Sequence, residues 1–338
     1  MKTEHEVVYS SDNGFYIESL EAVKEIEPGE VLIKPLKVGI CGSDFFSLDL
    51  YKGNALRLGH EWVGRVEKTN DYNNFKVGDL VTSTAILGCG KCSSCEEGNT
   101  NLCPNSKVLG SNDIGMLRTS IVLEERFLEK VPLIDLETAS LLEVMAVAEE
   151  AIVKLLEISN KVGKVIIWGG GPVGLCMGIY CKENEIEYLV VEKQINKVEK
   201  AKKYNLNSIS LGELLLTESL KNSFDTFIDC TGDKDGKGAW DYIPHFIKIN
   251  GSGVIVGKYK KDLSINFIKL SYLGLKISFM RGMNNTTLKR TIENWSEKLL
   301  KYKNLLITKR ISYLDLNGRK NFDDLRSNNL KICIHIQD

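Results

Sequence analysis

The chain has 338 residues, of which 43% are hydrophobic and 26% are charged, and its formal net charge is −1. This composition is typical of a globular protein long enough for about two domains, and the near-neutral charge argues against nucleic acid or an anionic membrane as the main partner. No stretch reaches the roughly 20 apolar residues of a membrane span, and the N-terminus lacks the basic and apolar pattern of a secretory signal, so we expect a cytoplasmic protein.

Residues 1–150 are predicted to form a mostly β domain. Short runs of β-forming residues, separated by Gly and Asp, recur at 31–33, 62–66 and 79–81. At 137–158 the pattern changes, because apolar and small residues recur at helical spacing without an intervening Pro or Gly. We expect one or two helices there, with Glu143 near their start.

Strands and helices alternate from Lys164 onward. The runs VIIW, YLVVE, FDTFIDC and GVIVG predict strands at 165–168, 188–192, 224–230 and 253–257. An apolar helix around 175–180 and a basic helix at 197–204 separate the first three runs. This alternation predicts an α/β, doubly wound parallel sheet with helices on both faces. A helix near 286–303 and a strand-like tail, KICIHI, complete the chain.

Four of the nine cysteines are clustered. Cys89, Cys92, Cys95 and Cys103 follow the spacing C-x2-C-x2-C-x7-C, with glycines among them. Four thiolates on a tight lobe suit a tetrahedral zinc ion, and because such a site is closed to substrate its role would be structural. Unrelated free cysteines and an iron–sulfur cluster are the alternatives.

A second set of metal ligands comes from Cys41 in the run VGICGSD and His60 in the run LGHE. Both residues are expected in turns flanked by glycine. With Glu143 they supply three ligands and leave one position open, as a catalytic zinc requires. Taken singly, Cys41 would be a buried core thiol and His60 a structural histidine, but their shared context favours a metal.

Two polar residues next to Cys41 complete this predicted site. Asp44 would accept a hydrogen bond from the ring N–H of His60 that does not bind the metal, and it would thereby fix the tautomer of the ring. The alternative is that Asp44 caps a local turn. Ser43 would place a hydroxyl beside the metal, where a proton must leave, or else it would only form the turn.

The run GGGPVG at 169–174 contains the pattern G-x-G-x-x-G. It follows a predicted strand and opens a predicted helix, which is the context that a dinucleotide fingerprint requires. Gly169 would permit the tight turn, Gly171 the close approach of the pyrophosphate, and Gly174 the packing of helix on strand. Pro172 and Val173 stand at the helix start, whose partial positive charge favours a phosphate.

Glu192 ends the next predicted strand, eighteen residues after Gly174. Its carboxylate is placed to accept hydrogen bonds from the ribose hydroxyls of adenosine, which favours NAD(H) and disfavours the 2′-phosphate of NADP(H). Lys193 and Lys197 oppose this preference, because either could pair with that phosphate, so NADP(H) stays an alternative. A solvated strand end is the other interpretation of Glu192.

With these motifs in this order, the chain resembles the zinc-containing medium-chain dehydrogenase/reductase family, which includes alcohol, sorbitol and threonine dehydrogenases. The motifs are GICGSD, LGHE, the four-cysteine lobe, LLEVMAVAEEA, GGGPVG, FIDCTG and VIVGKY. The resemblance extends from about residue 25 to the end. It implies a GroES-like β catalytic domain built from residues 1–150 and 290–338, with a Rossmann domain, residues 151–289, inserted between them.

The resemblance also implies roles for the residues around the second metal set. Cys41 and His60 look like ligands of a catalytic zinc, and Glu61 resembles the acidic residue beside that zinc. Glu143 stands where the polyol and threonine dehydrogenases have Glu. Ser43 matches the hydroxyl of the family's proton relay.

The remaining implications concern the cofactor, the second zinc and the assembly. Val256 and Gly257 match the strand end that lies near the nicotinamide carboxamide. The four cysteines match the family's structural zinc lobe, so two zinc ions are expected per subunit. Residues 272–279 match a segment that pairs across a two-fold axis, which implies a homodimer or homotetramer.

This sequence departs from the family pattern at several positions. Phe46 replaces a histidine that completes the proton relay in many members. Val144 replaces a proline after the helix-start glutamate, and Glu150 replaces a histidine. The spacing between Cys41 and His60 is a little shorter than is usual in the family. These departures concern the proton exit route and the substrate, and they leave the zinc ligands and the fingerprint intact.

We expect hydride transfer between NAD(H) and a polar secondary alcohol or ketone, such as a polyol, sugar derivative, sugar phosphate or hydroxy amino acid. Phe46 and Leu50 would line the substrate pocket. Arg118 and Arg281 are either anchors for a phosphate or carboxylate, or structural charges. The alternatives are an NADPH-dependent aldehyde or ketone reductase and a catalytically silent, nucleotide-binding relative that acts through partners.

Overall fold

The computed structural model describes residues 3–53, 55–70, 74–111, 114–232, 238–320, 325 and 329–337. Contacts divide the chain into two compact units: unit 1 comprises Met1–Glu143 with Gly282–Asp338, and unit 2 comprises Val144–Arg281. Unit 1 is therefore built from both ends of the chain and unit 2 from its middle. Among the described helices, none combines the length and the apolar character that crossing a membrane would require.

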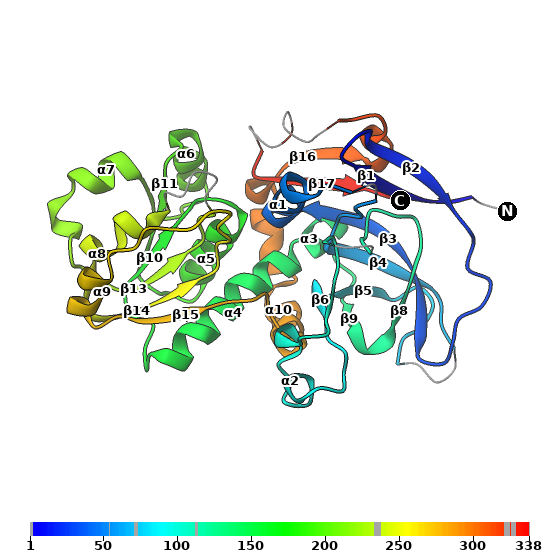
Figure 1. The fold of residues 1–338 in the computed structure, drawn as a ribbon, viewed down its shortest axis with the longest axis horizontal. Helices are drawn as coiled ribbons and strands as arrows, with labels where there is room; N and C mark the ends of the chain where they lie inside the picture. The colour runs from blue at the N-terminus through cyan, green and yellow to red at the C-terminus, as the bar shows by residue number, and fades with distance from the viewer. Residues whose placement is uncertain are drawn as a thin grey trace. The chain divides into compact units, whose positions relative to one another are not determined.

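Unit 1 is centred on a β sheet (Figure 1). Within the described residues its strands follow the order β16-β17-β3-β4-β5-β9, and β8 also pairs with β3. Their bounds are β3 Glu30–Ile40, β4 Glu61–Lys68, β5 Leu80–Ser83, β8 Ile121–Glu124, β9 Leu128–Val131, β16 Ile307–Ser312 and β17 Lys331–His335. The predicted C-terminal strand is β17, which pairs antiparallel with β3. The end of the chain thus belongs to the same sheet as its N-terminal strands.

The apolar core of unit 1 also draws on both ends of the chain. An N-terminal hairpin, which the sequence did not reveal, joins β1 (Glu4–Ser10) to β2 (Gly14–Leu20). Val7, Phe15, Trp62 and Leu316 share one buried cluster. Because residues far apart in the sequence bury one another here, both chain ends stabilise the strands that lead to Cys41 and His60.

Unit 2 contains the predicted parallel sheet (Figure 1). In the described ranges its strand order is β12-β11-β10-β13-β14-β15, and each neighbouring pair is parallel. The strands are β10 Val165–Trp168, β11 Tyr188–Glu192, β12 Ser208–Ser210, β13 Phe224–Asp229, β14 Ile247–Ile255 and β15 Lys276–Phe279. The connecting helices include α5 Pro172–Glu183, α6 Ile195–Lys203, α7 Leu211–Leu216, α8 Ile243–Phe246 and α9 Phe267–Leu273. The predicted fold class, a GroES-like β domain with a doubly wound α/β sheet, is confirmed.

The predicted helical segment at 137–158 consists of α3 (Leu136–Ala139) and α4 (Leu142–Ile158), and Glu143 lies in the first turn of α4. The predicted strand at 253–257 ends earlier, at Ile255. It ends because Val256 and Gly257 both donate their N–H groups to the carbonyl oxygen of Asp229, at 2.9 Å each. Neither residue continues the ladder with β15.

The helix predicted near 286–303 begins where expected, but its predicted length is wrong because it ends at Trp295. The structure has α10 (Asn285–Trp295), a 3-10 segment η5 (Lys298–Tyr302) and α11 (Lys303–Leu306). The hydroxyl of Ser296 donates to the carbonyl oxygen of Ile292 at 2.6 Å, and such a bond competes with the helical ladder and bends the helix. Leu299 and Leu305 beyond the break are buried, so the apolar periodicity continues although the helix does not.

Candidate metal and cofactor sites

The first metal-ligand set lies where β3 ends and β4 begins. The predicted glycine-flanked turn at Cys41 is corrected: Cys41 is the N-cap of a helix, α1 (Gly42–Leu50). The helix starts here because Asp44 Oδ2 accepts the backbone N–H of Cys41 at 2.8 Å and satisfies a terminal donor. Cys41, His60 and Glu61 each offer one ligand atom, and these atoms lie within 4.8 Å of one another.

His60 has a polar neighbour at each ring nitrogen. Asp44 Oδ1 lies 3.4 Å from Nδ1, and Ser43 Oγ lies 3.2 Å from Nε2. Burial lowers the pKa of His60, but Asp44 and Cys41 outweigh burial and leave this pKa well above its ordinary value. Because Nδ1 faces a carboxylate, Nε2 is the nitrogen available to a metal. Asp44 combines the two alternatives considered for it, since it caps a helix start and also faces His60.

Glu61 is held by a lysine that the sequence reasoning missed. Glu61 Oε2 accepts a hydrogen bond from Lys331 Nζ, and both side chains are buried. Lys331 opens β17, and β3 separates β17 from β4, which Glu61 begins. Gly39 on β3 stands opposite Glu61, and a Cβ at Gly39 would lie 2.6 Å from Glu61 Oε2. The sequence feature that indicates this contact is a lysine at the first position of an apolar strand, because a buried lysine requires a partner.

Gly110 is a second residue that the sequence did not indicate. Its φ of +77° lies in the left-handed region. A Cβ at this position would lie 2.9 Å from His60 Nδ1 and 3.1 Å from Asp44 Oδ1. The glycine therefore leaves the space in which the imidazole and the carboxylate approach each other.

Glu143 lies outside the group of three ligand atoms, although it is buried close enough to interact with them electrostatically. Burial raises the pKa of Glu143 to about 7, and the charges of His60 and Lys331 oppose this rise while Glu61 adds to it. Its role as a zinc ligand stays a prediction.

The donors at this site fit a zinc ion. A thiol, an imidazole and a carboxylate are the ligand types that zinc takes, and three protein ligands leave a position for another molecule. Glu61 Oε1 is buried and, among the described residues, has no hydrogen-bond partner. A buried carboxylate oxygen without a donor is costly, and a bound cation would remove that cost.

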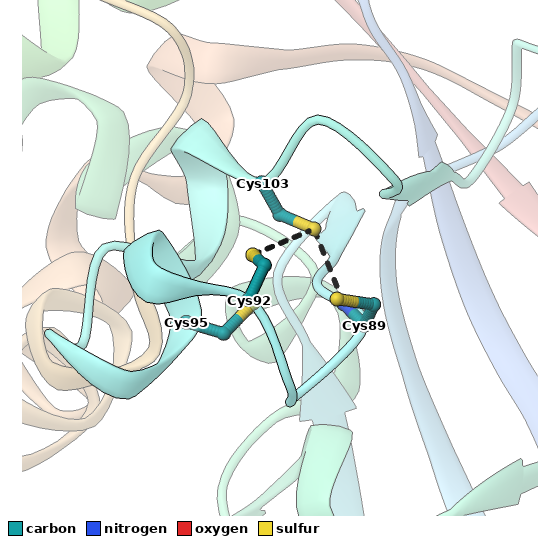
Figure 2. A group of neighbouring side chains, drawn as sticks. All are labelled: Cys89, Cys92, Cys95 and Cys103. Carbon is teal, nitrogen blue, oxygen red and sulfur yellow. Dashed lines mark hydrogen bonds between the residues drawn. The ribbon is translucent and has the colours of Figure 1, made fainter.

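The four cysteines of the lobe converge as predicted (Figure 2). They lie around α2 (Ser93–Glu96) and η1 (Thr100–Leu102), and their sulfur atoms are all within 4.8 Å of one another. Cys92 Sγ and Cys103 Sγ are 3.7 Å apart, and Cys103 Sγ accepts the backbone N–H of Cys89 at 3.3 Å. The backbone N–H of Lys91 and the neighbouring thiols lower the pKa of Cys89 to about 6. This donor set fits a closed, tetrahedral zinc site.

A third group of metal-type side chains consists of Glu137, Cys333 and His335. Arg310 binds both carboxylate oxygens of Glu137 at 2.8 Å each, and Lys303 lies 3.7 Å from it. Because two cations already neutralise the carboxylate, we assign no metal to this group.

The glycine loop of unit 2 has the geometry of a phosphate cradle. Gly169 follows β10 with a φ of +101°, Gly171 is the N-cap of α5, and Pro172 occupies the first turn. A Cβ at Gly174 would collide with the carbonyl oxygen of Gly169, whereas one at Gly171 would meet nothing within 4 Å. The open space before the N–H groups of α5 fits a pyrophosphate.

Glu192 is fixed next to this loop. Its carboxylate accepts backbone N–H groups from Gly170 at 2.9 Å, Lys193 at 2.7 Å and Gln194 at 3.0 Å. A Cβ at Gly170 would lie 2.9 Å from the Cβ of Glu192, so glycine permits this approach. The acidic group is therefore oriented before any ligand arrives.

A cavity of about 240 Å³ lies at the carboxyl ends of β10, β11 and β13, and its lining includes Trp168, Val191, Glu192, Thr231 and Tyr242. Ligands of open α/β sheets bind at this end of the strands. A wider surface hollow of about 610 Å³ is lined by Lys164, Glu187 and Tyr188 near the amino ends of β10 and β11. None of the predicted site residues lines that hollow.

The sequence also names Phe46, Leu50 and Arg118 as candidates for contact with the substrate. Phe46 and Leu50 lie one turn apart on α1, the helix that also carries Ser43, and Leu50 is 56% exposed. Their place in a substrate pocket stays a prediction. Arg118 Nη1 lies 3.6 Å from Glu6 Oε2, which supports the interpretation of Arg118 as a structural charge.

Known proteins resemble this chain along much of its length. Residues 27–133 match the alcohol dehydrogenase GroES-like domain. The chain is 29% identical over 224 residues to an L-threonine 3-dehydrogenase of Streptomyces avermitilis, and 30% identical over 226 residues to a sorbitol dehydrogenase of Halalkalibacterium halodurans. Each match covers 62% of this chain and 64% of the relative. A solved Escherichia coli structure, an oxidoreductase/dehydrogenase of unknown specificity, has a TM-score of 0.85 at 25% identity and covers 100% of both chains.

Proposed function

Because the chain belongs to the medium-chain dehydrogenase/reductase family, we propose that it is a zinc-dependent oxidoreductase that transfers hydride between NAD(H) and a polar secondary alcohol or ketone. The observation that carries the proposal is the group Cys41, His60 and Glu61, whose ligand atoms lie within 4.8 Å of one another. Two of its relatives are named for the oxidation of threonine and sorbitol, both of which carry a secondary hydroxyl among other polar groups.

Residues of unit 1 would bind the metal and transfer the proton, and residues of unit 2 would bind the cofactor. A zinc ion held by Cys41 and His60 would act as a Lewis acid toward the oxygen of the alcohol or ketone. Ser43 Oγ, 3.2 Å from His60 Nε2, would accept the proton of the substrate hydroxyl while its own proton passes to a ribose hydroxyl of the cofactor or to water. The glycine loop would hold the pyrophosphate of the cofactor, and Glu192 would bind the adenosine ribose.

For the substrate, we propose a polyol, a sugar derivative, a sugar phosphate or a hydroxy amino acid. The buried carboxyl of Glu143 supports a polar ligand, since it gives the surroundings of the metal set another hydrogen-bonding group. Arg118 adds no support for a phosphate anchor, because Glu6 faces its guanidinium. A screen of these compound classes by NAD(H) absorbance tests the proposal. An NADPH-dependent reductase and a silent nucleotide-binding relative are the two outcomes that would replace it.

We also propose a cytoplasmic location. The nine cysteines all lie in described ranges and no disulfide joins any of them. Reduced thiols persist in reducing compartments.

Zinc content is the first expected result. Protein purified without chelator should hold two zinc ions per chain, because the two ligand groups are separate. Cys41→Ser should lower the content to one and remove alcohol-dependent NAD reduction, while Cys181→Ser, a buried cysteine outside both groups, should keep both ions. Elemental analysis and absorbance assays measure this. A content near one that Cys41→Ser leaves unchanged would contradict the catalytic site.

Cofactor preference is the second expected result. The wild-type kcat/KM should be higher with NAD(H) than with NADP(H), because the fixed carboxylate of Glu192 would repel a 2′-phosphate. Glu192→Gln should reduce the ratio of kcat/KM with NAD(H) to kcat/KM with NADP(H) about tenfold, the equivalent of about 1.4 kcal/mol. Glu199→Gln on α6, an exposed acidic residue, is the matched control. If the wild type prefers NADP(H), the role proposed for Glu192 is wrong and Lys193 or Lys197 dominates.

Assembly is the third expected result. Within the described sheet β15 is an edge strand, and Phe279 on it is 76% exposed, as are Tyr272 at 82% and Phe267 at 72% on α9. Exposed edge strands with apolar side chains promote pairing, so we propose a homodimer or homotetramer. Phe279→Glu should dissociate it, whereas Leu133→Glu, in unit 1 and 86% exposed, should not. Light scattering that finds only wild-type monomer at micromolar concentration would refute this.

A further inference from the structure

Trp168 is the last residue of β10, immediately before the glycine loop. Its side chain is only 2% exposed. The indole Nε1 is buried and has no hydrogen-bond partner among the described residues. Tryptophan offers a donor and no acceptor, and buried donors are rarely left unpaired in native proteins. This N–H therefore indicates a missing acceptor.

The surroundings of Trp168 hold the indole in place. Its ring stacks on Tyr242, with centroids 6.1 Å apart and an interplanar angle of 18°. Phe246 meets the indole edge to face at 5.9 Å. A ring packed against two aromatic neighbours has little rotational freedom, so the direction of its N–H is fixed in advance of binding.

Trp168 also lines the cavity of about 240 Å³ at the carboxyl ends of the strands. Two other polar side chains of that lining, those of Thr231 and Glu192, already have partners. Thr231 Oγ1 donates to Asp229 Oδ1 at 2.5 Å, and the carboxylate of Glu192 accepts three backbone N–H groups. The indole N–H is thus a buried donor without an acceptor among the described residues, on a side chain that lines the cavity.

We propose that the Trp168 indole donates a hydrogen bond to a ring nitrogen of the purine base of the cofactor, which occupies this cavity. A purine is planar and apolar on its faces, and its ring nitrogens are acceptors at its edge. These properties complement a cavity that offers aromatic and aliphatic surface together with the buried indole donor of Trp168. The inference rests on the proposed function only in requiring a dinucleotide, and it makes Trp168 a binding residue that determines how tightly the base is held.

The test measures binding and not turnover. Calorimetric titration of the wild type with ADP-ribose is compared with Trp168→Phe, which keeps an aromatic ring and removes the N–H. We expect Trp168→Phe to weaken ADP-ribose about three- to tenfold, the effect of one neutral hydrogen bond. Trp240→Phe is the control, because Trp240 packs in the same apolar cluster without lining the cavity. It should change the affinity less than twofold.

Analogues of the ligand separate the hydrogen bond from a change in cavity shape. AMP is compared with its 1-deaza, 3-deaza and 7-deaza forms, each of which lacks one ring nitrogen. One analogue should bind the wild type about three- to tenfold less tightly than AMP does, and Trp168→Phe should bind that analogue and AMP equally.

Two results would overturn the inference and leave the proposed function intact. The first is an equal affinity of the wild type and Trp168→Phe for ADP-ribose. The second is that no deaza analogue loses affinity for the wild type in a way that Trp168→Phe abolishes. If the wild type does not bind ADP-ribose at all, the proposed function fails together with the inference.

Discussion

Replacing Lys331 by methionine is expected to lower the free energy of unfolding by about 3–5 kcal/mol, the cost of breaking a buried ion pair by removing one partner. Lys331 and Glu61 are both buried, and Lys331 Nζ donates to Glu61 Oε2. Methionine keeps the apolar stem and removes the cation. The carboxylate of Glu61 would then remain in the interior without that cation. Urea unfolding followed by tryptophan emission measures the loss.

Two further variants isolate the ion pair as the cause. Lys34→Met removes the cation of a partly exposed pair in the same sheet, Lys34 with Glu67, and should cost no more than about 1 kcal/mol. The double variant Lys331→Met/Glu61→Gln removes both charges and should recover most of the stability, because replacing both partners is far less costly than replacing one. A loss below about 1 kcal/mol for Lys331→Met, or no recovery in the double variant, would contradict this account of Glu61.

The ion pair between Glu61 and Lys331 also shows where sequence reasoning reached its limit. The ligand motifs around Cys41 and His60 are local, because each is a short run whose glycines and polar residues carry the signal. Lys331 lies 270 positions from Glu61, and only the pairing of β17 with β3 and of β3 with β4 brings the two together. Strand order and register depend on the whole sheet, so no local pattern could place that lysine.

The same reasoning explains which elements were predicted well. The strands of unit 2 are buried runs bounded by glycine and charge, and their alternation with helices leaves few arrangements open. At the start of α1 the sequence predicts a turn, because glycine and serine dominate residues 42–44. The decisive interaction there is the side chain of Asp44 on the N–H of Cys41, and an acidic residue at the third helical position was the available signal.

The unpaired donor of Trp168 and the role of Gly110 could not be predicted from the sequence, because both depend on tertiary packing. Trp168 reads as one more apolar residue of a strand, since the sequence does not show whether an indole N–H finds a partner. Gly110 reads as a loop glycine, and only its distance from His60 shows that the site depends on it. Both are properties of tertiary packing.

Replacing Ser43 by alanine is expected to lower kcat about 10²–10⁴-fold at neutral pH, the effect of losing a positioned acid–base group. Ser43 Oγ lies 3.2 Å from His60 Nε2, the nitrogen available to the metal, so the hydroxyl is adjacent to the place where the substrate proton must leave. Phe46, on the same helix, cannot carry a proton. The loss should shrink at high pH, where hydroxide replaces the hydroxyl as acceptor.

Two comparisons make this expectation specific. Ser47→Ala removes a hydroxyl one turn further along α1 and should leave kcat unchanged. Phe46→His should add to the pH–rate profile a group that titrates near the ordinary histidine pKa of about 6.5, because an imidazole on the same helix could carry the proton onward. The isotope effect with a deuterated alcohol shows whether hydride transfer limits the rate. If hydride transfer is limiting and Ser43→Ala matches the wild type at every pH, then Ser43 only shapes the start of α1, and the proton leaves by a route past Glu61 or Glu143.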